Sequence, residues 1–298
     1  MCAPRRWHPS ARAGILCGVS EAVGSVQSLH RYPVKSMLGE DLGRVDLDRR
    51  GVVGDRAYAL IDDETGKVVS IKRPKRWGRM FEFAAVTRDG TVEVRFPDGT
   101  RAAIDDASLP IRLSAFFERS VSVVATPPPD ATFDEVWMRD LKNGIDPIGS
   151  SRFEDGEEMI DNGQMMSANG NFSNGGPIHI VTTSTTRHFG QLAPGSRFTP
   201  KRFRPNIVIE TGGDGFIENE WTGRKLTIGA VRMTVLVPTP RCVMTTLRQG
   251  EFPADREVLR TIAQHNTVDI GIGVFPCLGV YAVSAEGLIR VGDPVTLS

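Results

Sequence analysis

The chain has 298 residues, which is enough for one large or two moderate domains with a substantial apolar core. Its 36 basic and 36 acidic side chains give a formal net charge of zero, so no global field favours nucleic acid or an anionic membrane. No apolar run approaches the roughly 20 residues that a membrane-spanning helix needs. We therefore expect no nucleic-acid or membrane partner, and any anion site must be local.

The first 22 residues are expected to form a disordered leader. Their apolar patch, Ala13–Cys17, is interrupted by Gly14 and is shorter than the hydrophobic core of a typical secretory signal. The four cysteines of the chain, Cys2, Cys17, Cys242 and Cys277, include no CxxC pair. This spacing disfavours a disulfide framework or a structural zinc site and favours a cytoplasmic location.

Residues 23–126 predict an N-terminal β-barrel-like domain. The segment contains several short strands at regular spacing, arranged as an antiparallel meander that starts near Gly24. Two turns stand out, Asp62–Gly66 and Arg88–Gly90, because a Gly-containing loop between alternating strands is a strong hairpin signal. Pro127–Pro129 then opens a polar stretch, and we expect residues 127–176 to be a surface connection with local helical turns.

Residues 177–298 predict a second β-rich domain with a few helices, so the chain as a whole belongs to the β-rich α+β class. Hydroxyl residues at 182–186 suit a helix N-cap, which either binds an anion or simply caps the helix. Residues 254–264 have the apolar spacing of an amphipathic helix. A last hairpin is expected across Ala285–Gly287.

Cys242 follows a predicted strand whose side chains alternate from Val231 to Val237. Pro238 and Pro240 end that strand and place Arg241 and Cys242 just beyond it. A cationic neighbour favours the thiolate, which is the form that acts as a nucleophile or as a soft metal ligand. A buried cysteine that packs as a small hydrophobe is the alternative interpretation.

Several short motifs occur together with this segment in a fixed order. In the second half they are Arg202-Phe203-Arg204-Pro205-Asn206, Trp221, Lys225–Val231 and Val291-Gly292-Asp293-Pro294. This set resembles the MOSC domain, the molybdenum-cofactor-binding module shared with molybdenum cofactor sulfurases. In the first half, Tyr32-Pro33-Val34-Lys35-Ser36 and Gly54–Leu60 resemble the β-barrel domain that precedes it in amidoxime-reducing proteins.

The resemblance implies a molybdenum–molybdopterin cofactor clamped between two β-rich halves, with Cys242 as the protein ligand to the metal. The implied cofactor contacts are Lys35, Ser36 and Arg56 on one side, Arg204, Asn206 and Arg241 on the other, and Thr182, Thr183, Ser184 and Tyr281 nearby. Lys72 and Arg73 match more loosely. For each basic residue an ordinary surface salt bridge is the alternative, and for Tyr281 a place in the core.

The sequence departs from the family at two positions near the metal. Asn174 stands where relatives tend to carry an aspartate, and it is our second catalytic residue; an amide cannot replace a carboxyl in proton delivery. Pro240 stands where relatives often carry serine. Cys277 falls where relatives have an aliphatic residue, so we expect it in the core and expect its removal to leave metal binding intact.

The resemblance implies an oxidoreductase that reduces N-hydroxylated or related N–O or S–O small molecules. Electrons are expected from a separate donor protein, such as a ferredoxin or a flavin reductase, because no iron–sulfur, haem or flavin fingerprint is present. The five histidines lack metal-ligand spacing, and no pyridoxal phosphate site is expected. A non-catalytic carrier of the cofactor or its sulfur is the main alternative, and a β-rich domain whose signature has decayed is a third.

Overall fold

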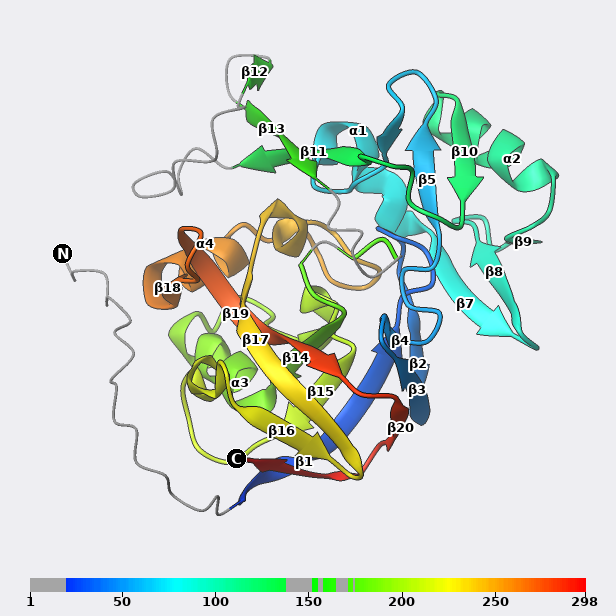
Figure 1. Ribbon diagram of the computed structural model, residues 1–298. Coiled ribbons are helices and arrows are strands. Elements are labelled where there is room, and N and C mark those ends of the chain that lie inside the picture. The colour runs from blue at the N-terminus through cyan, green and yellow to red at the C-terminus, as the bar shows by residue number, and fades with distance from the viewer. Residues whose placement is uncertain (1–19, 138–151, 155–157, 165–170, 174) are drawn as a thin grey trace.

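A closed barrel of seven strands forms the centre of the computed structural model, which describes residues 20–137, 152–154, 158–164, 171–173 and 175–298 (Figure 1). Each strand pairs with the next, and β19 pairs back with β14 to close the barrel. In order around the barrel the strands are β14 (Ile178–Thr182), β15 (Ile207–Glu210), β1 (Glu21–Arg31), β21 (Pro294–Leu297), β16 (Lys225–Ile228), β17 (Val231–Pro240) and β19 (Val274–Ser284). The expected β-rich fold class is confirmed.

Both barrel neighbours of strand β1, β15 and β21, lie more than 170 residues after it in the sequence. Leu29 lies opposite Ile207 of β15, and Ser25 lies opposite Pro294 of β21. A register shift between Val26 and Ser28 allows Val26 and Leu29 both to enter the barrel core. The first strand of the chain therefore completes a barrel that is otherwise built from residues 178–297.

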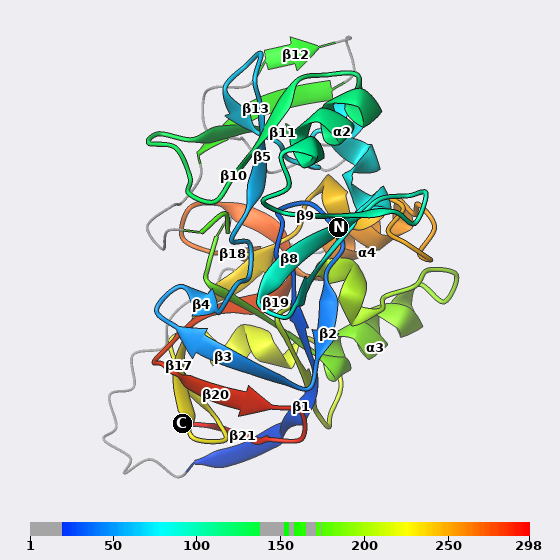
Figure 2. The same cartoon turned by 90° about the vertical axis from the view of Figure 1, so that its right-hand side faces the viewer.

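The barrel interior is filled by aliphatic side chains that alternate inward along the strands, including Ile180, Val235 and Val280, all fully buried. Two helices pack against its outside, α3 (Thr183–Leu192) and α4 (Glu257–His265), as Figure 2 shows for α3. Phe189 and Ile262 bury the contact between these helices and the barrel. The amphipathic helix expected near residues 254–264 is confirmed.

A second core lies under small sheets formed by residues 59–124, at the upper right of Figure 1. Two of these sheets and two helices surround it: β5 (Ala59–Asp62), β6 (Lys67–Val68) and β10 (Val121–Val124); β7 (Ala84–Arg88), β8 (Thr91–Arg95) and β9 (Arg101–Ala103); α1 (Pro74–Trp77) and α2 (Ser108–Phe117). Both expected hairpins are confirmed. Asp89 and Gly90 have φ of 50° and 82°, the left-handed pair that a two-residue hairpin turn needs.

The hairpin expected across Ala285–Gly287 is wrong. Strand β20 (Gly287–Arg290) pairs with β3 (Arg44–Asp48), which also pairs with β4 (Gly51–Val52), and Figure 2 shows β3 and β20 side by side. This pairing lets Ile289, fully buried, join Val45 and Leu47 in the barrel core cluster. Burial of these three side chains outweighs the local preference of the chain to turn back on itself.

The local helical turns expected after Pro129 are wrong for the described part of this stretch, which forms strands. They are β11 (Thr132–Trp137), β12 (Arg152–Glu154) and β13 (Glu158–Gln164), which form one antiparallel sheet. Two further short strands flank the barrel, β2 (Glu40–Leu42) on β1 and β18 (Thr267–Asp269) on β19. The domain boundaries predicted after residues 22, 126 and 176 stay predictions. None of the helices among the described residues has the length and apolar character needed to cross a bilayer.

Replacing Leu29 by Ala tests whether β1 is part of the barrel core. Leu29 is fully buried, so we expect the free energy of unfolding to fall by about 2–5 kcal/mol, measured by urea denaturation. Gln27→Ala on the same strand is the matched control, because Gln27 is exposed and its loss should cost less than about 0.5 kcal/mol. Equal effects of the two variants would contradict a buried β1.

Candidate functional site

Cys242 lies where β17 leaves the barrel and a short 3-10 helix, η6 (Val243–Thr246), begins. Its carbonyl oxygen accepts hydrogen bonds from the Thr245 amide at 3.2 Å and the Thr245 hydroxyl at 3.0 Å, which fixes the backbone there. The residue is 9% exposed, and its side chain belongs to none of the four apolar clusters formed by described residues. Cys277 belongs to none of these clusters either, so what distinguishes Cys242 is its place at the end of β17, next to Arg241.

Arg241 is buried beside this cysteine. Its backbone amide donates to the Pro276 carbonyl at 2.7 Å, and its Nη2 donates to the Phe203 carbonyl at 3.0 Å. Its Nη1 lies 3.5 Å from Nε2 of His179, whereas its Nε is buried and has no hydrogen-bond partner among the described residues. Burial lowers the pKa of the Arg241 guanidinium, because the charged form loses its solvation by water.

Arg204 and Arg56 meet on the other side of the site. Both have left-handed backbones, with φ of 55° and 48°. The Arg204 guanidinium lies 4.1 Å from the centroid of the Tyr32 ring and donates to the Met37 carbonyl at 2.5 Å. Burial lowers the pKa of Arg204 to about 10. Arg56 donates from Nη2 to the Arg204 carbonyl at 3.4 Å and forms an ion pair with Asp55. Asp55 in turn accepts the Tyr32 amide at 2.8 Å.

Two lysines complete the group of cations. Lys35 is buried and donates from Nζ to the Phe172 carbonyl at 3.2 Å; burial, followed by the charge of Lys72, holds the pKa of Lys35 well below its usual range. Lys72 pairs with Glu135 at 2.5 Å. Burial acts to lower the pKa of Lys72, but Glu135 and the neighbouring Cys242 raise it more. Lys72 therefore belongs to the electrostatic environment of Cys242.

The basic side chains of the site differ in whether a carboxylate neutralises their charge. Arg56 and Lys72 each have a carboxylate partner, Asp55 and Glu135. Arg204 and Arg241 bond to backbone carbonyl groups, and no carboxylate among the described residues forms an ion pair with either. Burial of a charge without a counterion is costly, so this end of the barrel is suited to an anion.

Comparison with known proteins assigns this arrangement to a family. One family model, the MOSC N-terminal beta barrel domain, matches residues 23–132, and a second, the MOSC domain, matches residues 168–296. The chain is a MOSC domain protein.

The relatives of this MOSC domain protein carry two kinds of name. "Mitochondrial amidoxime reducing component 2" of Rattus norvegicus is 33% identical over 125 residues, which are 40% of this chain and 36% of that protein. The Homo sapiens protein of the same name is 37% identical over 101 residues, 32% of this chain and 29% of its own. "Molybdenum cofactor sulfurase" of Drosophila persimilis is 26% identical over 263 residues, 82% of this chain and 31% of that protein.

The matched region thus spans at most about a third of these curated relatives. Among solved structures, the YUAD protein from Bacillus subtilis aligns over 94% of this chain and 98% of its own, with 10% identity and a TM-score of 0.44.

The hydroxyl residues at the start of α3 form hydrogen bonds with other residues of the MOSC domain. Thr182 caps the helix by accepting the Thr185 amide at 3.3 Å, and its hydroxyl donates to Glu218 at 2.7 Å. Ser184 lies 3.0 Å from the same hydroxyl, and Thr183 accepts the Thr211 amide at 3.0 Å. These bonds match the plain helix cap that the sequence left open as an alternative.

Asn206 and Ser36 also have partners within the fold. The Asn206 amide accepts the His179 backbone N–H at 3.1 Å and donates to the His30 carbonyl at 3.4 Å, so it joins three neighbouring strands. The Ser36 hydroxyl accepts the Ile71 amide at 3.2 Å. Arg73 pairs with Asp134 at 2.6 Å. For each of these side chains the structure shows a structural bond, and their contact with a cofactor stays a prediction.

Tyr281 lies at the centre of the charged group. Its ring is partly buried and rests on the backbone of Gly175 and Gly176, where any Cβ atom would lie 2.6 or 2.7 Å from a Tyr281 carbon. The centroid of the ring is 5.7 Å from that of His179.

Asn174 lies outside the described residues. Cys277 is fully buried, and burial raises the pKa of its thiol to about 12, so the expected place of Cys277 in the core is confirmed.

His179 has a place in the site that its spacing in the sequence gave no reason to expect. It is buried between Arg241 and the Arg204 carbonyl, and burial, reinforced by Arg241, holds its pKa well below the usual range. A Cβ atom at Gly279 would lie 2.7 Å from Nε2 of His179, so glycine is needed there for the ring to fit. A neutral imidazole can accept the hydrogen bond that Arg241 donates.

Two cavities lie at the edge of this site or away from it. One cavity of 220 Å³ has Tyr32 and Arg204 in its wall, and one of 450 Å³ lies beside β3 and β20. Cys242 lines neither of these two. The described residues include no group of three or more His, Cys, Asp and Glu side chains suited to a metal ion.

Glu218 gives a pH-dependent test of the network beside the site. Burial raises the pKa of Glu218 above its ordinary 4.5, although hydrogen bonds from Thr185 and Thr182 oppose the shift. The folded state then binds more protons than the unfolded state, so wild-type stability falls as the pH rises from 4.5 through the folded pKa. Glu218→Gln removes this loss.

We expect the unfolding free energy of the wild type to drop relative to Glu218→Gln between about pH 4 and pH 7 in urea titrations. Glu220→Gln, an exposed position in the same 3-10 helix, should show no such divergence from the wild type. A constant difference between wild type and Glu218→Gln across this range would contradict the buried carboxyl.

Proposed function

We propose that this MOSC domain protein binds a molybdenum cofactor at Cys242 and reduces N-hydroxylated or related N–O or S–O small molecules. One observation carries the proposal. A buried thiol at the end of β17 lies beside Arg241, which together with Arg204 buries positive charge without a carboxylate partner. An anionic group with a metal that accepts sulfur ligands satisfies both features.

The residues present fit a phosphate-bearing pterin. Arginine presents its N–H groups in a planar fork that suits phosphate oxygens, and the buried Nε of Arg241 has an unused donor. The buried hydroxyl of Ser173, next to the Phe172 carbonyl that Lys35 contacts, also has no partner among the described residues. Arg56, Arg204, Arg241 and Lys35 would hold the phosphate end of the cofactor.

Cys242 would supply the protein ligand to the metal, because an anionic sulfur is a suitable donor to molybdenum. When bound, the cofactor supplies two-electron exchange with the oxygen of the substrate. The chain positions the groups around the cofactor. The ammonium groups of Lys35 and Lys72 lie 5.3 and 5.0 Å from the centroid of the Phe133 ring, which would help exclude water. The roles of Asn174, Asn206, Ser36, Thr182, Thr183, Ser184 and Tyr281 belong to this proposal.

The source of the electrons and the location of the protein are also proposals. A separate electron-donor protein would reduce the cofactor, and the protein would act in the cytoplasm. Support for a reductase comes from the relatives named amidoxime reducing component, which match about a third of this chain. A small N-oxygenated molecule would be the substrate.

A carrier of molybdenum cofactor or of its sulfur is the second candidate. The relative named molybdenum cofactor sulfurase matches 82% of this chain, a larger share than the reductase relatives match. Both candidates use Cys242 and the cationic site. They differ in whether the bound metal turns over a substrate.

The Cys242→Ser substitution tests the proposed ligand. Wild-type protein purified from cells that make the cofactor should contain molybdenum and should reduce an amidoxime or a hydroxylamine when given an artificial reductant. Cys242→Ser should lose this activity, because an alcohol oxygen replaces the thiolate at the metal. Cys277→Ala is the matched control: it removes a buried thiol elsewhere, and metal content and activity should remain. Undiminished activity in Cys242→Ser would refute the assignment, whereas molybdenum without any reduction would favour the carrier.

The Arg241→Met substitution separates a binding role from a structural role. Because Arg241 buries a charge without a carboxylate partner, its replacement should change the unfolding free energy of the cofactor-free protein by less than about 1 kcal/mol. Its molybdenum content should fall to near zero. A loss of about 3–5 kcal/mol in the cofactor-free protein would instead mark Arg241 as half of a structural pair.

A further inference from the structure

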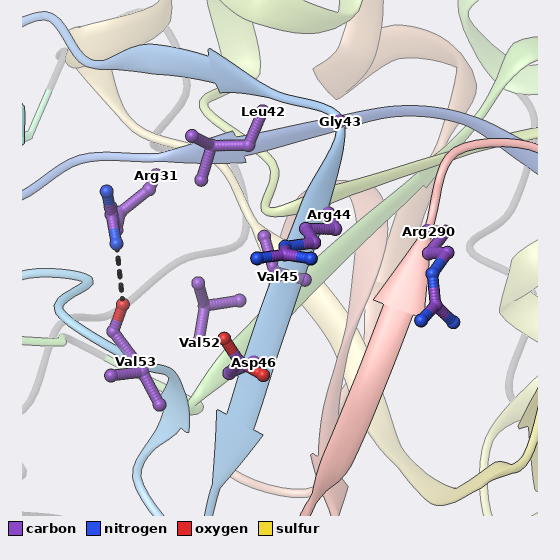
Figure 3. A pocket seen from close by; sticks show the side chains of 9 residues that line it. All are labelled: Arg31, Leu42, Gly43, Arg44, Val45, Asp46, Val52, Val53 and Arg290. Carbon is purple, nitrogen blue, oxygen red and sulfur yellow. Dashed lines mark hydrogen bonds between the residues drawn. The ribbon is translucent and has the colours of Figure 1, made fainter.

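A second cationic site lies outside the proposed cofactor site. The larger of the two cavities, 450 Å³, is lined by three arginines, Arg31, Arg44 and Arg290, and by Asp46. Figure 3 shows Arg31 on one side of this cavity, Arg290 on the other and Arg44 between them. Arg31 and Arg44 come from β1 and β3, near the start of the chain, and Arg290 comes from β20, near its end.

Arg44 and Arg290 form an opposed pair of like charges. They are direct partners in the antiparallel register of β3 and β20, and both side chains are exposed. Neither forms an ion pair with any carboxylate in the part of the chain that the structure describes. Like charges directly opposite on neighbouring strands destabilise the pairing, and an anion between them would remove the repulsion.

The chain contains another opposed pair that behaves differently. Arg95 lies opposite Arg101 in the register of β8 and β9. There Glu93 lies 4.0 Å from Arg101 and supplies a compensating charge, and neither arginine lines either of the two cavities. Arg44 and Arg290 differ from that pair in two ways: both line a cavity, and neither forms an ion pair with a carboxylate of the described residues.

Arg31 adds a guanidinium held in a fixed orientation. Its Nε donates to Glu40 at 2.8 Å, and its Nη1 donates to the Val53 carbonyl at 3.3 Å, the dashed line in Figure 3. Glu40 pairs with Arg31. Asp46 lines the cavity and Asp293 accepts the Arg290 backbone amide at 2.8 Å, but neither carboxylate forms an ion pair with Arg44 or Arg290 among the described residues.

Apolar side chains form the rest of the cavity wall. Val52 is buried, Leu42 is half-buried, and Val53 is 43% exposed, which is unusual for a large apolar side chain in this protein. A small inorganic ion would leave this surface in contact with water. An anion that also carries a short apolar body would cover it.

We propose that this cavity binds an organic oxyanion, a phosphate or carboxylate attached to a small apolar group. The guanidinium groups of Arg44 and Arg290 bind the oxyanion from both sides. The wall at Leu42, Val52 and Val53 receives the apolar body. This site is independent of the function proposed for Cys242.

Isothermal titration calorimetry of the purified full chain tests the site with four probes: phenyl phosphate, benzoate, inorganic phosphate and benzyl alcohol. Phenyl phosphate or benzoate should bind more tightly than inorganic phosphate or benzyl alcohol, because only the first two carry both a charge and an apolar ring. Whichever of phenyl phosphate and benzoate binds more tightly identifies the head group as phosphate or carboxylate. In the double variant Arg44→Gln/Arg290→Gln, its affinity should fall about tenfold or more, the expected loss of charge-assisted hydrogen bonds.

The matched control is Arg95→Gln/Arg101→Gln, which removes the same charge from the other opposed pair and should leave the affinity unchanged. The urea midpoint of Arg44→Gln/Arg290→Gln should equal or exceed that of the wild type, since a repulsion is removed, and this verifies folding. Unchanged affinity in Arg44→Gln/Arg290→Gln would place the binding elsewhere, for example at Arg204, and would overturn the proposal. Equal losses in both double variants, or no binding of either organic anion to the wild type, would overturn it as well.

Discussion

Positive charge buried without a counterion is the constraint on which the site depends. Arg204 and Arg241 bond to the carbonyl groups of Met37 and Phe203, and these dipoles only partly replace the solvation that both guanidinium groups lose on folding. A fold keeps such an arrangement at a cost in stability, and the cost is recovered when an anion binds. The same reasoning explains why His179 beside them is held neutral, since a further cation would add to the repulsion.

Barrel closure is what brings these groups together. Strand β1 lies between β15 and β21, so the segment that follows it, from Tyr32 to Ser36, reaches the end of the barrel where Arg204 precedes β15. Strand β17 delivers Arg241 and Cys242 to the neighbouring position, and its partner β19 carries Tyr281. The two halves of the chain therefore share one barrel, and the site lies where they meet.

Much of this could be predicted from the sequence, because local signals coincide with the tertiary structure. The alternation from Val231 correctly places Cys242 just beyond a strand, and Asp89-Gly90 forms the turn that its left-handed preference predicts. The prediction that the prolines end this strand after Val237 is wrong, because β17 pairs with β19 as far as Pro240. Other features depend on distant partners. Strand β20 leaves β19 to bury Ile289 beside Val45, and no local pattern near residue 287 specifies that choice. His179 enters the site only because Gly279, a hundred residues later, leaves room for its ring.

The most direct test of the account is the X-ray absorption spectrum at the molybdenum edge, recorded on protein purified from cells that make the cofactor. We predict one more sulfur ligand to molybdenum in the wild type than in Cys242→Ser, while Cys277→Ala keeps the wild-type spectrum. A metal environment that is identical in the wild type and in Cys242→Ser would contradict it.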